Sequence, residues 1–221
     1  MPAVDRQAEH SRSIEDRNSY WGEKAVASLD WFDGFDTVSQ GSFIDGDVAW
    51  FVNGKLNACY NAVDRHVETR GDQTAIIWEG DEPGETKSFT YKELLKRVCQ
   101  IANAMKAEGV KRGDAVTIYM PMMPEVTMVM LACARIGAIH SVIFAGFSAD
   151  AIAERIAASG SKWVFTSDEG LRGGKKLPLK NICDAAMSKE VSLADDANGH
   201  KYVTKKRNKR TNEGRNERKN E

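Results

Sequence analysis

Residues 115–120 read Ala-Val-Thr-Ile-Tyr-Met, an apolar run with the length and the β-branched content of a buried strand. Two runs of the same kind follow, over residues 138–144 and 162–166, at a spacing of 23 or 24 residues. Segments with helical signals lie between and after these runs, at residues 124–137, 148–160 and 179–187. This alternation predicts an α/β fold with a parallel βαβ sheet and right-handed crossovers.

A helix with strong end signals precedes this unit. Thr90 and Glu93 have the spacing of a capping box, apolar residues then recur at the helical period, and Gly109 marks the end. Before this helix, residues 74–78 and 86–89 have the pattern of two strands around a Gly-Asp-Glu-Pro-Gly turn. That pattern predicts a β-hairpin.

The first 60 residues have a different character. They concentrate aromatic residues, among them Trp31, Phe35 and Trp50, while glycines divide the segment into short pieces. We expect a loop-rich aromatic extension whose rings pack onto the larger body, because aromatic side chains bury much area per residue. The alternative is an exposed surface that binds a partner.

Composition and charge exclude several classes of protein. The 221 residues are 42% hydrophobic and 29% charged, with a formal net charge of -1, which excludes a wholly disordered, collagen-like or uniformly basic chain. The longest apolar run, near residues 126–134, is too short to cross a bilayer, so we expect no membrane association. Residues 1–18 lack the apolar core of a secretory signal. The four cysteines form no Cys-x-x-Cys pair, which favours reduced thiols in a cytoplasmic protein.

The C-terminal segment differs in composition from the rest. Residues 201–221 carry nine Lys or Arg against three Asp or Glu, and Tyr202 and Val203 are their only apolar residues. We expect no ordered structure over residues 201–221, since such a segment buries too little apolar surface to offset the entropy of ordering.

Loops that follow the predicted strands are the candidate functional surface, because open parallel sheets bind ligands at the carboxyl ends of their strands. The run Arg172-Gly-Gly-Lys175 follows the third strand, and two cations beside a flexible backbone suit a phosphate. A plain surface turn has the same composition. Residues 145–147 follow the second strand and lead into a helix N-terminus, where free amides could receive an anion. The alternative is a tight turn in which Ser148 merely caps the helix.

No catalytic group stands out, and we predict neither a catalytic nor a metal-binding residue. The four histidines, at positions 10, 66, 140 and 200, do not have metal-ligand spacing. His140 falls in a predicted buried strand, where a hydrogen-bonded core histidine is more typical than a catalytic base. Neither a Gly-x-x-x-x-Gly-Lys-Ser/Thr loop nor a Gly-x-Ser-x-Gly elbow occurs.

Several segments resemble the acetyl-CoA synthetases, which belong to the acyl-adenylate-forming superfamily. The similar segments occur in the family's order and include residues 41–66, 75–80, 120–125, His140-Ser-Val-Ile-Phe-Ala-Gly-Phe-Ser148 and Ser167-Asp-Glu-Gly-Leu-Arg-Gly-Gly-Lys175. The resemblance implies the N-terminal part of the family's large, adenylate-forming domain. It divides the chain into a charged segment (1–17), a family extension (18–72), the first part of the AMP-binding domain (73–190) and a non-family basic tail (191–221).

The resemblance implies an AMP-forming acetate–CoA ligase. ATP and acetate would give acetyl-adenylate and pyrophosphate, with Mg²⁺ shielding the phosphates, and coenzyme A would then give acetyl-CoA and AMP. In the family, the Arg-Gly-Gly-Lys region holds the 3′-phosphate end of coenzyme A, which also passes the Ala-Gly-Phe loop. Carried over, the cofactor-binding residues are Arg172, Gly173, Gly174 and Lys175 and, with weaker support, Ala145, Gly146 and Phe147.

The sequence departs from the family beyond about residue 190. The family's Thr-Ser-Gly-Ser-Thr-Gly-x-Pro-Lys-Gly phosphate loop and its C-terminal catalytic lysine are absent from the 221 residues. We therefore expect a truncated chain that is inactive alone. The alternative is a non-catalytic fragment that binds coenzyme A or phosphate and whose basic tail touches nucleic acid or another anionic surface. We expect no nucleic-acid binding outside that tail.

Overall fold

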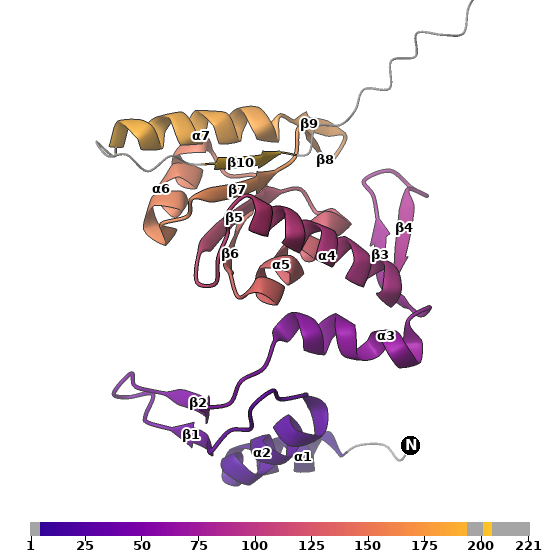
Figure 1. The fold of residues 1–221 in the computed structure, drawn as a ribbon, viewed down its shortest axis with the longest axis vertical. Coiled ribbons are helices and arrows are strands. Elements are labelled where there is room, and N and C mark those ends of the chain that lie inside the picture. Colours follow the sequence, from indigo (N-terminus) through magenta and orange to yellow (C-terminus); the bar gives the residue numbers. More distant parts are fainter. Residues whose placement is uncertain (1–4, 194–200, 205–221) are drawn as a thin grey trace, which may run out of the picture.

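A four-stranded parallel sheet forms the centre of the molecule in a computed structural model that describes residues 5–193 and 201–204. The strand order is β10-β7-β5-β6, as Figure 1 shows. The strands are β5 (Ala115–Met120), β6 (Ile139–Phe144), β7 (Trp163–Thr166) and β10 (Lys201–Thr204). All pairings in this sheet are parallel, which confirms the predicted α/β fold.

Helices cover both faces of the sheet. The helices are α4 (Tyr91–Ala107), α5 (Pro124–Ile136), α6 (Ala149–Ser159) and α7 (Leu179–Leu193). Apolar residues of α4 and α5 pack with Val116 and Ile118 of β5, whereas those of α6 and α7 pack with Tyr119. Because successive side chains of a strand point to opposite faces, β5 contributes to two separate cores. The result is a three-layer arrangement.

The predicted hairpin and the capped helix are confirmed. Strands β3 (Thr74–Glu79) and β4 (Thr86–Thr90) pair in antiparallel fashion. At the start of α4, the Thr90 hydroxyl accepts from the amide of Glu93 at 3.2 Å, and the Glu93 carboxylate accepts from the amide of Thr90 at 2.9 Å. This reciprocal capping box satisfies two amides that the helix itself leaves without partners.

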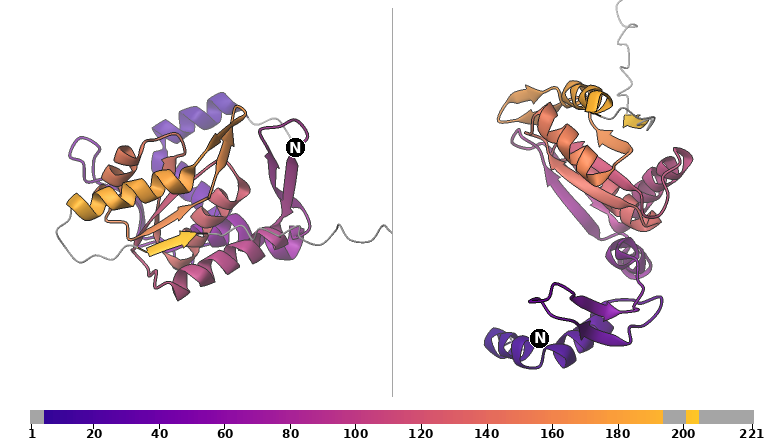
Figure 2. Two further views of the ribbon diagram at one scale, coloured as in Figure 1. Left: turned by 90° about the horizontal axis from the view of Figure 1, so that it is seen from above. Right: turned by 90° about the vertical axis from the view of Figure 1, so that its left-hand side faces the viewer.

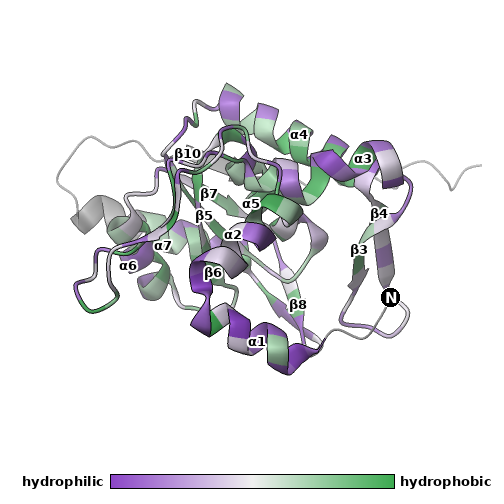
Figure 3. Cartoon of the chain, turned by 90° about the horizontal axis from the view of Figure 1, so that it is seen from below, coloured by the Kyte–Doolittle hydropathy of each residue, from purple (hydrophilic) through white to green (hydrophobic). Residues whose placement is uncertain are grey.

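The N-terminal extension contains more regular structure than the sequence indicates. Its elements are α1 (Arg6–Glu15), α2 (Arg17–Ser28), β1 (Thr37–Gln40), β2 (Ala49–Val52), η1 (Tyr60–Asp64) and α3 (Arg65–Arg70). The expectation of a loop-rich segment is therefore wrong for residues 6–28. Helix α1 buries none of its residues, so it has no apolar stripe that the sequence could reveal, and Figure 3 shows it as largely hydrophilic.

Charged pairs hold α1 against α2. Arg12 lies 2.6 Å from Glu23, and Lys24 lies 2.8 Å from Glu9. The carboxylate of Asp5 caps the first turn of α1. These polar contacts, and not an apolar stripe, hold α1 in place. A search of the sequence for apolar periodicity therefore does not find this helix.

Aromatic residues of the extension pack mainly on one another. The rings of Trp31, Phe35 and Phe51 lie with centroids 5.1–5.5 Å apart. Other apolar side chains face solvent, since Phe43 and Ile44 are 73% and 95% exposed. The expectation that these aromatics pack onto the larger body is therefore wrong, and the exposed surface that was the alternative describes Phe43 and Ile44 better.

Residues 57–64 join the extension to the α/β body. The right-hand view of Figure 2 shows the extension below the body. Both oxygens of Asp64 accept from the Arg135 guanidinium of α5, at 2.8 and 2.9 Å. This hydrogen bond raises the pKa of Arg135 above its ordinary value. The Asn57 amide donates to the carbonyls of Ala134 and Arg135 at the end of the same helix, at 3.0 and 3.2 Å.

Two expectations about strands are corrected. His140 is exposed rather than buried, because β6 forms one edge of the described sheet and leaves Ile139 and Phe144 exposed as well. Residues 201–204 form β10, although we expected no order there. Backbone pairing with β7 does not require apolar side chains, so composition alone could not exclude it. The rest of the tail, at residues 205–221, lies outside the described residues.

No helix within the described part of the chain is long and apolar enough to cross a bilayer. The four cysteines are free, as predicted.

We predict that Arg135→Ala lowers the free energy of unfolding by about 1–3 kcal/mol, because it leaves the mostly buried Asp64 carboxylate without its partner. Lys55→Ala is the matched control, since Lys55 and Asp33 form an exposed pair whose loss should change stability by under about 0.5 kcal/mol. Urea denaturation measures both. Equal effects of the two variants would show that the Asp64–Arg135 contact is not a structural anchor.

Thiol reactivity should separate Cys99 from the other cysteines. Burial raises the pKa of Cys133 to about 12 and that of Cys183 to about 11, and it also raises the pKa of Cys59. These thiols stay protonated near pH 8, whereas Cys99 is partly exposed. Iodoacetamide should therefore label Cys99 first in the folded protein, as peptide mass spectrometry would detect. Labelling of Cys133 at the same rate in native buffer would contradict this.

Candidate functional site

The candidate site lies at the carboxyl edge of the sheet. In the parallel register, Met120 of β5 is opposite Phe144 of β6, and Tyr119 is opposite Thr166 of β7. The three strands therefore end at one level, and the loops that follow them are neighbours. This placement confirms that the predicted loops share one edge.

The Arg172-Gly-Gly-Lys175 run forms the end of a hairpin and not a plain loop. Strands β8 (Gly170–Arg172) and β9 (Lys175–Leu177) pair in antiparallel fashion, with Arg172 opposite Lys175. Gly173 and Gly174 have φ values of 56° and 72°, the left-handed conformation that two-residue hairpin turns require. The glycines are thus needed for the turn itself. Because the turn sets its two flanking residues opposite each other, two cations stand side by side.

Arg172 lies against the loop that follows β6. Its guanidinium carbon lies 4.9 Å from the centroid of the Phe144 ring, a cation–π contact. A Cβ atom at Gly146 would lie 3.0 Å from an Arg172 guanidinium nitrogen and 2.9 Å from the Phe144 ring. A side chain at position 146 would collide with Arg172 and Phe144, so glycine is the residue that fits there. The structure thus brings together residues that lie 26 positions apart in the sequence.

The remaining residues of the 145–147 loop have structural partners. The Tyr119 hydroxyl donates to the Phe147 carbonyl at 3.1 Å, and burial raises the pKa of Tyr119, so that the phenol stays protonated. The Phe147 ring lies 4.5 Å from the Arg155 guanidinium carbon of α6. Ala145 packs on the apolar core of α6 and α7. Ser148 caps α6, as predicted.

The charge of the hairpin is only partly neutralised. Lys176 pairs with Glu169 at 3.1 Å, whereas within residues 5–193 and 201–204 neither Arg172 nor Lys175 forms an ion pair. Both side chains are exposed. Two adjacent cations that form no ion pair with the described carboxylates are suited to a phosphate group.

A third segment, which the sequence did not indicate, also reaches this site. The turn between β3 and β4 brings Asp81 to the hairpin, where its carboxylate accepts from the amides of Gly173 and Gly174. The Trp78 indole of β3 donates to the carbonyl of Met122, in the loop after β5, at 2.8 Å. A contact between residues 92 positions apart leaves no local pattern, so the sequence held no signal for it.

The described residues do not fit a magnesium ion. Among residues 5–193 and 201–204, no three His, Cys, Asp or Glu side chains gather in a position to hold a metal. Mg²⁺ is held by carboxylates and phosphate oxygens, and the carboxylates of Asp81 and Glu169 at this edge are already bound to the glycine amides and to Lys176.

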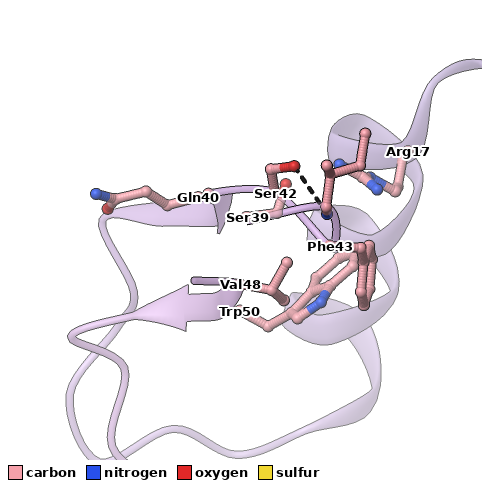
Figure 4. A pocket seen from close by; sticks show the side chains of 9 residues that line it. Arg17, Ser39, Gln40, Ser42, Phe43, Val48 and Trp50 are labelled. Atoms are coloured by element: carbon pink, nitrogen blue, oxygen red, sulfur yellow. Dashed lines mark hydrogen bonds between the residues drawn. The ribbon is translucent and has the colours of Figure 1, made fainter. Parts of the chain in front are cut away.

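A separate cavity of about 320 Å³ lies in the N-terminal extension, as shown in Figure 4. Phe43, Ile44, Val48 and Trp50 provide its apolar walls, and Arg17 is the only charged residue among the described ones that line it. The Arg17 guanidinium carbon lies 5.3 Å from the centroid of the Trp50 ring. The described residues that line this cavity all lie between positions 17 and 50, and none belongs to the loops at the carboxyl edge of the sheet.

Comparisons with known proteins agree with this architecture. Residues 63–220 match the model of the AMP-binding enzyme family, and residues 6–62 match the model of the acetyl-coenzyme A synthetase N-terminus. The acetyl-coenzyme A synthetase of Alkalilimnicola ehrlichii is 53% identical over 178 residues, which cover 80% of this chain and 28% of that protein. Acetyl-coenzyme A synthetase 2 of Pseudomonas aeruginosa is 49% identical, with 83% and 28% covered.

A solved structure has the same fold. Acetoacetyl-CoA synthetase from Streptomyces lividans superposes with a TM-score of 0.78 at 22% identity, over 92% of this chain and 32% of that one. The chain therefore spans about a third or less of the length of these relatives.

We predict that Gly146→Ala weakens the binding of inorganic phosphate about tenfold, because the new methyl group displaces the Arg172 guanidinium and one charge-assisted hydrogen bond is lost. Gly34→Ala is the control, since a Cβ atom there meets no atom within 4 Å. NMR titration measures both variants. Unchanged phosphate binding by Gly146→Ala would separate the loop from the anion site.

Proposed function

Since the chain belongs to the AMP-binding enzyme family, we propose that it is the N-terminal portion of an AMP-forming acetate–CoA ligase. Within that enzyme it supplies part of the coenzyme A site. The observation that carries this proposal is the placement of Arg172 and Lys175, two cations without an ion-pair partner among residues 5–193 and 201–204, beside the loop after β6 at the carboxyl edge of the sheet.

The proposed reaction has two steps. The carboxylate oxygen of acetate attacks the α-phosphorus of ATP, and the bond to pyrophosphate breaks, which gives acetyl-adenylate. The thiol of coenzyme A then attacks the acetyl carbon, and AMP leaves as acetyl-CoA forms. Support for acetate as the substrate comes from the relatives named acetyl-coenzyme A synthetase, at 49–53% identity.

Arg172 and Lys175 are assigned to the 3′-phosphate of coenzyme A. A phosphate between them would accept charge-assisted hydrogen bonds from a guanidinium fork and an ammonium group. Gly173 and Gly174 hold the turn that separates the two cations. The 145–147 loop forms the adjoining wall, along which the nucleotide end of coenzyme A lies.

Adenylation requires groups outside these 221 residues. The sequence lacks the Thr-Ser-Gly-Ser-Thr-Gly-x-Pro-Lys-Gly loop of the family, so we expect no acetyl-adenylate formation by this chain alone. Magnesium would accompany ATP, and no step is assigned to it here. The division of the chain at residues 17, 72 and 190 stays a prediction.

A cytoplasmic location is part of the proposal, since four free cysteines are typical of a reducing compartment. The alternative function, a non-catalytic fragment with a nucleic-acid-binding tail, gains no support from relatives that are named as synthetases. Most of that tail lies outside the described residues.

We predict that Arg172→Ala weakens binding of adenosine 3′,5′-bisphosphate about tenfold or more but leaves binding of adenosine 5′-monophosphate unchanged, because the latter lacks the 3′-phosphate. Lys175→Ala should act in the same direction. Lys176→Ala is the matched control, since it removes the same charge from a lysine that already pairs with Glu169. Calorimetric titration measures all three. Equal losses for both nucleotides, or an equal effect of Lys176→Ala, would show that this hairpin does not recognise the 3′-phosphate.

A further inference from the structure

The two glycine amides at the hairpin turn already have an acceptor. The amide of Gly173 donates to one oxygen of Asp81 at 3.3 Å, and the amide of Gly174 donates to the other oxygen at 2.9 Å. One carboxylate thus bridges two successive amides of a turn that is otherwise exposed. Hydrogen bonds to a charged acceptor are stronger than those between neutral groups.

Asp81 is presented from a well-anchored hairpin. The Trp78 indole donates to the Met122 carbonyl at the sheet edge, and the Lys87 ammonium lies 4.9 Å from the centroid of the Trp78 ring. The amide of Gly80 donates to the Glu85 carbonyl at 2.6 Å and closes the hairpin next to Asp81. The β3–β4 hairpin therefore fixes the backbone around Asp81, and the glycine amides fix its carboxylate.

The hairpin that carries the two cations is anchored at its base, where Leu177 packs on the core of α6 and α7, but its turn has few supports. Strands β8 and β9 have three residues each. Arg172 rests on Phe144 on one side, and Asp81 holds the turn on another. Because Arg172 and Lys175 directly flank the two glycines, any rotation of the turn moves both cations together.

We propose that Asp81 is a positioning residue for the anion site: it fixes the Gly173-Gly174 turn and thereby holds Arg172 against Phe144. It follows that a bound phosphate is held by side chains and not by the two glycine amides, which Asp81 occupies. The identity of the phosphate ligand rests on the proposed function, whereas the positional role of Asp81 does not.

The test compares three variants of the full chain. Asp81→Ala removes the carboxylate, and Asp81→Asn keeps one carbonyl oxygen that can accept from one amide. Glu82→Ala is the matched control, because it removes the same charge from the neighbouring exposed residue of the same turn. NMR on isotope-labelled protein measures hydrogen exchange at Gly173 and Gly174 and the ring-current shift that Phe144 causes at the Arg172 side chain. Calorimetry measures binding of adenosine 3′,5′-bisphosphate and of adenosine 5′-monophosphate.

Asp81→Ala should speed amide exchange at Gly173 and Gly174 about tenfold, abolish the ring-current shift of Arg172 and weaken bisphosphate binding about tenfold. Binding of the monophosphate should not change. Asp81→Asn should recover part of each loss, and Glu82→Ala should stay within about twofold of the unsubstituted protein on all measures.

Other outcomes would overturn the proposal. Tighter bisphosphate binding by Asp81→Ala would mean that the carboxylate competes with the ligand. Unchanged exchange or an unchanged Arg172 shift would mean that Asp81 does not set the turn. If the unsubstituted chain fails to bind the bisphosphate, the proposed function fails, and the exchange rates and the Arg172 shift still decide the role of Asp81.

Discussion

The burial of β5 between β6 and β7 is the constraint on which the rest of the structure depends. Val116, Ile118 and Tyr119 are fully buried, and both backbone edges of this strand are paired. A strand with neighbours on both sides and apolar residues on both faces requires a helical layer above and below it, which α4, α5, α6 and α7 provide. Parallel pairing then aligns the carboxyl ends of the strands, so one edge collects all of their loops.

The candidate site consists of short structural elements that lie at that edge. The β8–β9 hairpin places Arg172 opposite Lys175, the absence of a side chain at Gly146 leaves room for Arg172, and the β3–β4 hairpin supplies Asp81. The tips of both hairpins are exposed, whereas Ile76 and Phe89 of the β3–β4 hairpin pack on the apolar core. This arrangement is consistent with a surface that binds the nucleotide end of a cofactor and leaves the reacting groups to other parts of a longer enzyme.

The extension joins the body through a junction with an apolar and a polar part. Cys59 and Val63 are fully buried in the core that α4 and α5 form with β5. Asp64 and Arg135 form a partly buried pair, and Asn57 satisfies two carbonyls at the end of α5. Elsewhere the extension carries exposed apolar side chains such as Phe43 and Ile44.

The sequence by itself determined the strands and helices of residues 74–166 and the helix that begins at Leu179, because strong apolar periodicity, the Thr90–Glu93 capping box and glycine ends act locally. It did not indicate the β8–β9 hairpin between them. It nevertheless identified the cationic run at Arg172–Lys175 as a candidate phosphate site, although a plain surface turn has the same composition. It could not reveal α1, which buries nothing, or β10, which pairs through its backbone. Only the tertiary structure decided that His140 is exposed on an edge strand, that Arg172 rests on Phe144, and that Asp81 bridges the glycine amides. These outcomes depend on contacts between residues far apart in the chain, for which local sequence patterns carry no signal.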